Sequence, residues 1–374
     1  MFLTDEERRL TIQGCRFCPM CYHADTAALI LRKETNTPRG RGLILHALDH
    51  GVLKWEDPWI GDIFYKSFTD GLPQEWCAGH YDHDELVIDA RRRLAEKGFL
   101  PEEARQAMNR TEKNGSPYAE PGVNPPDFLR EIGAASKTGA ALLFYLGCSA
   151  RSLYPSSARA LFRILKATGI PFQVLESETC CGMTLYQLGD FAGASRQARK
   201  TAQDILRSGA RELVLLDADC YRMFTTRYRK FGALLPEGLK VCHVSEWLAD
   251  RLSRGALPIR QGRRRATYHD PVSLARFTKI HEAPRSVIRA LFDPGLQEME
   301  WPREKAHDCG AGGGMVFTNP EIAREAARRC YDQARRTGAE ILITASPPCA
   351  FQLAGVSSAD LPVRDLVEAV ADAL

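Results

Sequence analysis

The sequence SGARELVLLDADC at residues 208–220 and the sequence TGAEILITASPPC at residues 337–349 follow one pattern. Each begins with a Gly-Ala turn, continues as an apolar strand, and places a cysteine directly after that strand. Upstream of them, Cys181-Gly182 is matched by Cys309-Gly310 at nearly the same offset. Such an internal repeat indicates that the later part of the chain contains two copies of one structural unit.

Each copy is expected to open with a strand and to carry a helix before its last strand. Strands that alternate with helices favour a parallel sheet with helices on both faces. The expected opening strands are 140–146 and 265–269, and the expected helices are 192–208 and 320–337. At the start of the second helix, Asn319 is expected to cap the first free amides, and a proline fits the first helical turn.

Cysteines stand at the ends of several of these strands. Cys148, Cys220 and Cys349 come directly after expected strands, and Cys180-Cys181 follows a short apolar run at 172–176. In parallel sheets, ligands gather beyond the carboxyl ends of the strands. The repeat therefore predicts that these cysteines lie where such a sheet places its binding site.

The order of the segments predicts the domain organisation. A stretch rich in Pro, Gly and polar residues, TEKNGSPYAEPGVNPPD, separates the repeats from an N-terminal part with helix-like segments. The predicted fold class is α/β: an N-terminal helical ferredoxin-like cluster domain followed by two tandem α/β modules with parallel sheets. The predicted parts are the helical domain 1–110, a linker 111–135, a first module 136–262 and a second module 263–374.

Composition narrows the classes of function. The 374 residues are 44% hydrophobic and 26% charged, close to the average for a soluble globular protein. A net charge of +3 is too small to indicate nucleic acid, and no apolar run reaches the ~20 residues of a membrane span. The N-terminus lacks the layout of a signal peptide, which predicts a cytoplasmic protein. Twelve cysteines in a reducing compartment indicate metal binding or catalysis rather than disulfides.

The chain opens with the run Cys15-Arg-Phe-Cys18-Pro-Met-Cys21, and C-x2-C-x2-C is the core of the ferredoxin binding run. The position of the fourth ferredoxin cysteine holds Asp25, so a ligand must come from elsewhere. Cys77 is the one other cysteine before residue 148, and the residues after it resemble those after the last cysteine of a second ferredoxin run. We therefore predict one [4Fe-4S] centre with the ligands Cys15, Cys18, Cys21 and Cys77.

Zinc is the alternative at these four thiolates, because structural zinc sites use the same donors. In that interpretation the protein is a zinc-stabilised scaffold without redox chemistry. His23, His80 and His83 are spare donors, expected at the surface or in hydrogen bonds near the cluster. The triple run with one distant cysteine suits a cubane better than paired zinc knuckles, so the prediction is iron.

The second half resembles a known family. Cys148 after a strand, then Cys180-Cys181-Gly182, then a lone Cys220 is similar to the cysteine-rich CCG domain. That domain occurs in a subunit of heterodisulfide reductase, in the iron–sulfur subunit of glycolate oxidase and in lactate-utilisation iron–sulfur proteins. Two further segments support the resemblance: TPRGR at residues 37–41 is similar to the Ser-Pro-Arg-Gly-Arg segment of these proteins, and HDP at residues 269–271 matches the start of a second domain.

The resemblance implies a second [4Fe-4S] centre in the first module. Asp217 stands where some relatives carry a further cysteine, which matches the glycolate oxidase pattern of four thiolates. The alternative is a set of buried structural cysteines. The implied ligands are Cys148, Cys180, Cys181 and Cys220.

The second module has lost half of that ligand set. Val272 and Asp308 occupy two of its cysteine positions, so Cys309 and Cys349 remain, with His269 and Asp308 as conceivable further ligands. We expect a cluster-free structural copy that serves as a docking surface. The glycine run after Cys309 has no phosphate-loop lysine behind it, which argues against a nucleotide site.

The family resemblance also implies a function. The chain is expected to be a non-catalytic electron-transfer subunit of a flavin-dependent dehydrogenase or demethylase complex. Its expected partners are a flavin-containing dehydrogenase subunit and a quinone, an electron-transfer flavoprotein or another carrier, in a hetero-oligomer that can lie at the membrane through a partner. The alternatives are a catalytic disulfide reductase of the heterodisulfide type and the zinc-stabilised scaffold.

Overall fold

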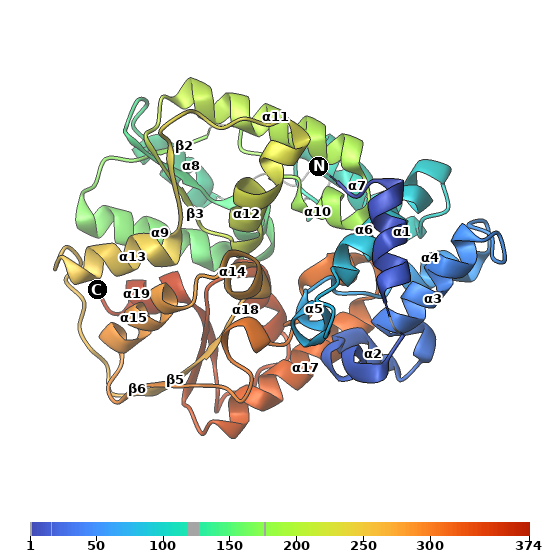
Figure 1. The fold of residues 1–374 in the computed structure, drawn as a ribbon. Helices are drawn as coiled ribbons and strands as arrows, with labels where there is room; N and C mark the ends of the chain where they lie inside the picture. The colour runs from blue at the N-terminus through green and yellow to red at the C-terminus, as the bar shows by residue number, and fades with distance from the viewer. Residues whose placement is uncertain (1, 16, 119–126, 176) are drawn as a thin grey trace.

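The computed structural model describes residues 2–15, 17–118, 127–175 and 177–374. Figure 1 shows a group of helices at the N-terminal end, drawn in blue and cyan, beside two α/β units drawn in green to yellow and in orange to red. Each α/β unit contains a four-stranded parallel sheet. The predicted fold class is therefore confirmed.

The N-terminal part is built from helices that carry their own start and stop signals. The first helix has a capping box, in which Thr4 and Glu7 satisfy each other's backbone amides. Helix α6 (His83–Lys97) is capped at its start by the side chain of Asp82, and it ends at Gly98, which has the left-handed backbone conformation. These helices are α1 (Asp5–Gly14), η1 (Pro19–Ala24), α2 (Thr26–Leu31), η2 (Glu34–Asn36), α3 (Pro38–Asp49), α4 (Pro58–Tyr65), α5 (Leu72–Trp76), α6 (His83–Lys97) and α7 (Glu102–Asn114).

The first module follows helix α8 (Asp127–Ala135), and its strands run in the order β2-β1-β3-β4. Its strands are β1 (Leu142–Tyr145), β2 (Gln173–Val174), β3 (Glu212–Leu215) and β4 (Lys240–His243). Its helices are η3 (Ser149–Leu153), α9 (Pro155–Thr168), α10 (Met183–Leu188), α11 (Phe191–Ser208), α12 (Ala218–Arg222), η4 (Met223–Arg227), η5 (Tyr228–Phe231) and α13 (Val244–Ser253). The chain moves outward from β1 to β2 and then crosses to the other side at β3. The gap between β1 and β3 is thus the topological switch point, where open parallel sheets bind ligands.

The second module repeats this topology with the order β6-β5-β7-β8, so its switch point lies between β5 and β7. Its strands are β5 (Arg265–His269), β6 (Gly295–Gln297), β7 (Ile341–Thr344) and β8 (Val363–Asp365). Its helices are α14 (Val272–Thr278), α15 (Glu282–Leu291), η6 (Arg303–Lys305), η7 (Gly312–Gly314), α16 (Met315–Thr318), α17 (Pro320–Arg336), α18 (Pro347–Ala354) and α19 (Leu366–Asp372).

The elements predicted from the repeat lie close to where they were expected. Helices α11 and α17 match the two predicted helices within one residue at each end. Strand β2 is shorter than the predicted 172–176, and residue 176 lies outside the described residues. Part of the predicted linker, 119–126, also lies outside them. The predicted domain boundaries stay predictions.

One local prediction is wrong. Asn319 occupies the N-cap position of α17, but its side chain makes no capping hydrogen bond. Its Nδ2 instead donates to the carbonyl of Tyr65, 3.2 Å away in the N-terminal part. A contact between distant segments has replaced the local cap.

The two modules pack through an approximate two-fold arrangement. Helix α9 of the first packs on α19 of the second, and the corresponding pair, α15 and α13, also pack together. Helix α12 likewise contacts α14, and its counterpart α18 contacts η3. The sheets share one apolar core across this contact, which includes Phe144 and Trp247 from one module and Ile288 and Ile343 from the other. The two modules therefore share one hydrophobic core and are not separately packed domains.

One buried arginine of the N-terminal part contacts both modules. The guanidinium of Arg91 donates to four carbonyls: Phe64 at 2.9 Å, Ser67 at 2.7 Å, Gln187 at 2.8 Å and Gly313 at 2.7 Å. The last two belong to the first and second modules respectively. Arg91 has no exposed surface, so these carbonyls have the guanidinium in place of water.

The glycine run after Cys309 serves this contact. A Cβ at Gly313 would lie 2.3 Å from the carbonyl oxygen of Ser67, and the φ of Gly313 is +61°. Only glycine allows the second module to approach the N-terminal part so closely. The glycine run thus allows close packing of the second module against the N-terminal part.

Candidate metal centres

The first-module thiol set comprises four cysteines gathered at the switch point of the first sheet. Cys148 follows β1, Cys220 lies in α12 after β3, and the adjacent pair precedes α10. All four side chains are buried, with at most 7% of their surface exposed. The set is Cys148, Cys180, Cys181 and Cys220.

The four thiols form one connected row. Cys180 accepts hydrogen bonds from Cys148 and Cys181, which lower its pKa well below the ordinary value of a thiol. The hydrogen bond to Cys180 and burial raise the pKa of Cys148. The hydrogen bond with Cys181 lowers the pKa of Cys220, but burial and nearby negative charges together outweigh it and raise that pKa to about 12. The pocket thus concentrates thiolate character on Cys180, which is the form that binds metal.

Glycines leave room around this set. Gly182 has φ +96° and donates its N–H to the sulfur of Cys180, 3.4 Å away. A Cβ at Gly182 would lie 3.2 Å from the carbonyl of Ala194 on α11. A Cβ at Gly147, where φ is +82°, would lie 3.2 Å from the sulfur of Cys220. Both glycines keep the turn around the sulfurs free of side-chain atoms.

The N-terminal thiol set, Cys15, Cys18, Cys21 and Cys77, lies nearer the surface. Cys18 is exposed, Cys15 and Cys77 are half-buried, and Cys21 is buried. Burial raises the pKa of Cys15, and the charges of Cys77 and Cys18 raise it further. Burial raises the pKa of Cys21 to about 11, with Cys15 among the neighbours that contribute. Helix α5, which ends directly before Cys77, packs against η1, which contains Cys21, so the segment that carries Cys77 lies against the cysteine run.

The position of the missing fourth ferredoxin cysteine has a structural role. Asp25 caps α2 by accepting from the amide of Ala28 at 2.8 Å. Its other oxygen pairs with the buried guanidinium of Arg41, also at 2.8 Å. Arg41 belongs to the TPRGR segment, and Arg39 of the same segment donates to the carbonyl of Phe17 inside the cysteine run. That segment thus holds the cysteine loop in place.

The second module brings three donor groups together at its own switch point. His269 ends β5, Cys349 lies in α18 after β7, and Cys309 precedes the glycine run. One ligand atom from each residue lies within 4.8 Å of the others, and all three residues are buried. The sulfurs of Cys309 and Cys349 are 2.7 Å apart. No other group this tight is found among the described residues.

Asp308 takes the backbone role of the cysteine that it replaces. Its Oδ1 accepts from the amides of Gly310 at 2.7 Å and Gly312 at 3.1 Å. In the first module the sulfur of Cys180 accepts from Gly182, the counterpart of Gly310. Burial raises the pKa of Asp308 to about 7. The turn has kept its hydrogen-bond acceptor while losing the thiolate.

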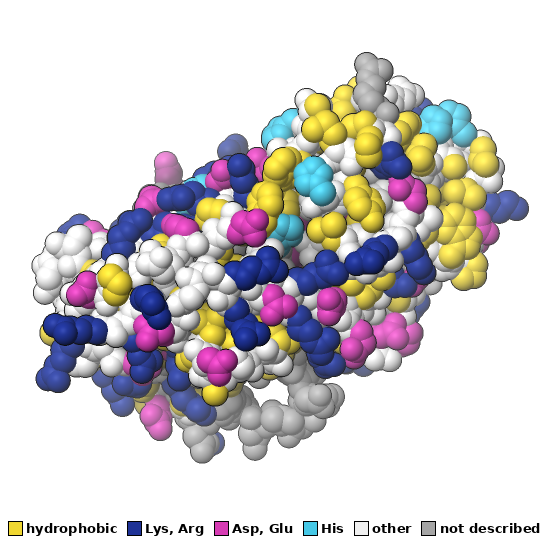
Figure 2. All heavy atoms as spheres, turned by 90° about the horizontal axis from the view of Figure 1, so that it is seen from below, with side chains coloured by type: hydrophobic (Ala, Val, Ile, Leu, Met, Phe, Trp, Pro, Cys, Tyr) yellow, Lys and Arg dark blue, Asp and Glu magenta, His cyan; other side chains and the backbone are white. Residues whose placement is uncertain are grey.

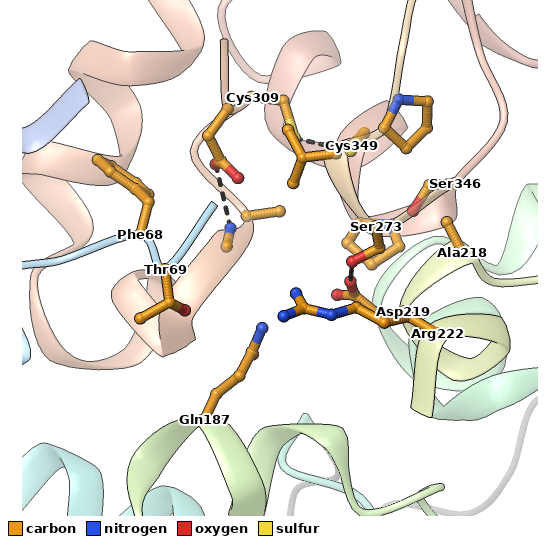
Figure 3. Close-up of a pocket in the computed structure, with 16 residues that line it drawn as sticks. Phe68, Thr69, Gln187, Ala218, Asp219, Arg222, Ser273, Cys309, Ser346 and Cys349 are labelled. Atoms are coloured by element: carbon orange, nitrogen blue, oxygen red, sulfur yellow. Dashed lines mark hydrogen bonds between the residues drawn. The ribbon is translucent and has the colours of Figure 1, made fainter. Parts of the chain in front are cut away.

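Figure 3 shows the cavity between the two modules onto which Cys309 and Cys349 open. Asp219 and Arg222 reach it from the first module, and Ser273 donates to Asp219 across it. The cavity has a volume of about 20 Å³, room for about one water molecule.

Comparison with known proteins decides the family. The family model of the cysteine-rich CCG domain matches residues 142–225 and 266–354. Over 326 residues the chain is 32% identical to a subunit of the dihydromethanophenazine:CoB–CoM heterodisulfide reductase of Methanosarcina barkeri, covering 82% of this chain and 76% of that protein. The chain belongs to the cysteine-rich CCG-domain family. The predicted resemblance is confirmed.

Further CCG-domain relatives are longer than this chain. The EtfAB:quinone oxidoreductase of Syntrophomonas wolfei is 25% identical over 80% of this chain and 44% of its own length. The probable iron-sulfur-binding oxidoreductase FadF of Bacillus subtilis is 25% identical over 80% of this chain and 45% of its own length. This chain therefore spans less than half of these two relatives.

A solved structure shares the fold at much lower sequence identity. A hypothetical protein from Helicobacter pylori superposes with a TM-score of 0.64 at 10% identity, over 100% of this chain and 73% of that one. The likeness shows that this three-part architecture is not unique to this sequence.

The donor sets fit iron–sulfur clusters in two of the three places. A cubane binds its four cysteines through four different irons, so its ligands stand farther apart than the ligands of one ion. Both four-cysteine sets have the four thiol donors that a [4Fe-4S] cluster requires. Membership of the CCG family and iron–sulfur relatives support cluster binding, while the eight ligands remain a prediction.

Two features of these sites were not found by reasoning from sequence. His269 was considered as a conceivable ligand, but the sequence offered no signal that it meets Cys309 and Cys349 together. Arg39 was quoted as part of a motif, without a role. The hydrogen bond to Glu34 raises the pKa of Arg39 most, and the charges of Cys21 and Cys18 also raise it. The guanidinium of Arg39 is therefore close enough to these two cysteines to interact with their charge. The sequence gives no signal for this role, because Arg39 lies 18 residues after Cys21.

Replacing Arg39 with glutamine is expected to lower the reduction potential of the N-terminal centre by tens of millivolts. A nearby positive charge favours the added electron, and screening at this partly exposed position keeps the effect on the order of tens of millivolts. A redox titration followed by electron paramagnetic resonance measures it. Lys97→Gln, an exposed charge change at the end of α6, is the control. Equal potentials in Arg39→Gln and wild type would contradict the assignment.

Proposed function

We propose that this chain is an electron-transfer subunit of a flavin-dependent oxidoreductase complex. It holds one [4Fe-4S] centre at the N-terminal thiol set and a second at the first-module thiol set. Such centres exchange single electrons with a flavin partner and with a quinone, an electron-transfer flavoprotein or another carrier. The names of the relatives from Syntrophomonas wolfei and Bacillus subtilis support this class of function.

The observation that carries the proposal is the contrast in burial between the two thiol sets. Cys180, Cys181 and Cys220 are each at most 2% exposed, within a core shared with the N-terminal part. The N-terminal set reaches the surface through Cys18. A buried centre inside and an exposed centre at the edge suit a relay, in which a partner meets the outer centre and the protein protects the inner one.

The N-terminal part also offers a surface for a partner. Figure 2 shows hydrophobic and histidine side chains gathered at the end of the molecule that carries the N-terminal helices, whereas lysines and arginines dominate the opposite end. Exposed apolar patches of this kind mark interaction sites. The large hydrophobic side chains exposed in this part are Leu10, Met20, Leu43, Val52, Trp59 and Phe99.

A catalytic disulfide reductase is the second candidate, because the relative from Methanosarcina barkeri belongs to a heterodisulfide reductase. That reaction requires a disulfide to reach a cluster. The burial of Cys148, Cys180, Cys181 and Cys220 argues against such access in this chain. Stopped-flow mixing of the reduced protein with small disulfides separates the two functions, because a relay stays reduced and a reductase is oxidised.

Iron and acid-labile sulfide assays of the protein purified without air test the proposal directly. About eight irons and eight sulfides per chain are expected for two [4Fe-4S] centres. About four of each would leave one centre and overturn the two-centre relay. A colourless protein with zinc at the N-terminal set would favour the scaffold instead.

The double variant Met20→Lys, Leu43→Lys is expected to weaken binding of the flavoprotein partner by about 2 kcal/mol, roughly thirtyfold in Kd. Both side chains are nearly half-exposed in the N-terminal part, and buried charges would oppose docking. Partner-dependent cluster reduction measures the effect, with unchanged iron content. Leu206→Lys on α11, at a more exposed leucine of the first module, is the control. An equal loss of partner affinity in the double variant and in Leu206→Lys would contradict the docking surface at the N-terminal part.

A further inference from the structure

The second module keeps a ligand set that suits one metal ion rather than a cluster. We propose that His269, Cys309 and Cys349 bind a single zinc ion, with the fourth position open to the cavity between the modules. The site is independent of the two iron–sulfur centres, so it can exist whether or not the proposed relay does.

The spacing of the donors supports a single ion. A ring nitrogen of His269 and the two sulfurs all lie within 4.8 Å of one another. Two thiolates on tetrahedral zinc lie about 3.8 Å apart, given Zn–S bonds of about 2.3 Å. The two sulfurs, now 2.7 Å apart, need to separate by about 1 Å to bind it. Each thiol releases its proton as its bond to the metal forms.

The substitutions between the two modules change the donor set together. Two thiol positions of the first module have become Val272 and Asp308 in the second. A further position, which is not a thiol position, also differs. Tyr145 ends β1 in the first module, and His269 ends β5 at the matching place in the second. A site that loses two thiols and gains an imidazole has changed from the donors of a cluster to the mixed sulfur and nitrogen donors that zinc prefers.

His269 is held in place by its neighbours in the way expected of a metal ligand. Its Nε2 lies 3.3 Å from the carbonyl of His307, which can only accept, so this nitrogen carries the proton. Its Nδ1 is then unprotonated and accepts from the hydroxyl of Thr344, 3.3 Å away, so this hydroxyl has to rotate away when an ion takes the lone pair. A backbone carbonyl behind the imidazole fixes the ring and its tautomer, as in known metal sites. Tyr145 donates to the carbonyl of Thr179 at the matching place in the first module.

The fourth position is provided by the cavity. Cys309 and Cys349 line it, together with Asp219, Arg222 and Ser346 (Figure 3). Its volume of about 20 Å³ admits about one water molecule, the usual fourth ligand of zinc sites with three protein ligands. The ion would join β5, α18 and the loop before the glycine run within the second module.

Metal analysis of the full chain, purified without air, tests the proposal. We expect one zinc per chain in addition to any iron, and an X-ray absorption first shell of two sulfurs and at least one nitrogen at the zinc edge. His269→Tyr installs the residue of the first module and is expected to lower the affinity for added Zn²⁺ at least tenfold with iron unchanged. Cys309→Ala with Cys349→Ala is expected to abolish zinc binding.

Cys330→Ala is the control for loss of a buried cysteine in the same module, and both metals should be unchanged in it. Three results would each overturn the zinc site. The first is a wild-type protein that contains no zinc and does not bind added Zn²⁺. The second is a double cysteine variant that loses iron rather than zinc. The third is a disulfide between Cys309 and Cys349, detected by alkylation under denaturing conditions. If the cysteine variants do not fold, the absorption spectrum of the wild-type protein still decides the ligand set.

Discussion

Replacing Cys180 with alanine is expected to lower bound iron from about eight to about four atoms per chain, with an equal loss of sulfide. Cys180 accepts hydrogen bonds from Cys148, Cys181 and the amide of Gly182, so it is the thiol most ready to act as a thiolate. Three buried thiols without it would not complete a four-ligand set. Iron and sulfide assays on protein purified without air measure the loss.

The control for this variant is Cys242→Ala. Cys242 is a buried free cysteine in β4 of the same module, outside the thiol set, and iron should stay near the wild-type value. Cys77→Ser should remove the other four irons, because the segment that carries Cys77 lies against the cysteine run of the N-terminal set. The double variant Cys180→Ala, Cys77→Ser should then be free of iron. Iron unchanged in Cys180→Ala would remove the first-module site from the proposal.

Replacing Arg91 with alanine is expected to destabilise the whole chain by about 4 kcal/mol or more. The change leaves four buried carbonyls without a donor and opens a cavity between the N-terminal part and both modules. Burial lowers the pKa of Arg91 to about 10, so the guanidinium is charged at neutral pH and its hydrogen bonds are charge-assisted. The melting temperature should fall by roughly 5 °C or more, measured without air at one scan rate.

Arg92→Ala is the matched control for this variant. Arg92 is the next residue of α6, is partly exposed, and pairs with the exposed Glu96 and with Asp89. Asp89 keeps its ion pair with Arg93, so the loss of Arg92 should cost about 1 kcal/mol. Arg91→Met keeps most of the side-chain volume and should still be strongly destabilised, which separates the lost hydrogen bonds from the cavity. Equal melting temperatures for Arg91→Ala and Arg92→Ala would show that the buried contact does not hold the parts together.

In the part of the chain that the structure describes, no helix is both long enough and apolar enough to span a bilayer.

Local patterns were sufficient to predict much of this protein. The apolar runs and the helices before them predicted β3, β7, α11 and α17, because the period of apolar residues is a local property of the chain. The cysteine after each strand predicted a site at the carboxyl edge of a parallel sheet, because all strands of such a sheet end on the same side. The CCG family followed from the same residues.

Contacts between distant segments were beyond such patterns. Asn319 was predicted as a helix cap from its neighbours, whereas it binds Tyr65 more than 250 residues earlier in the chain. The role of Arg91 was not predicted, since each of its four acceptors is a backbone carbonyl, and backbone atoms leave no trace in a sequence.

The sequence by itself determined the family and the fold class and predicted the residues that would hold iron, because ligand type and spacing are local properties of the chain. Only the tertiary structure decided that the segment before Cys77 packs against η1 and that His269 meets Cys309 and Cys349. The physical reason is that each strand crossing brings residues far apart in the chain to one edge of a sheet. Which side chains then face each other depends on register and packing, and neither is visible in any single segment.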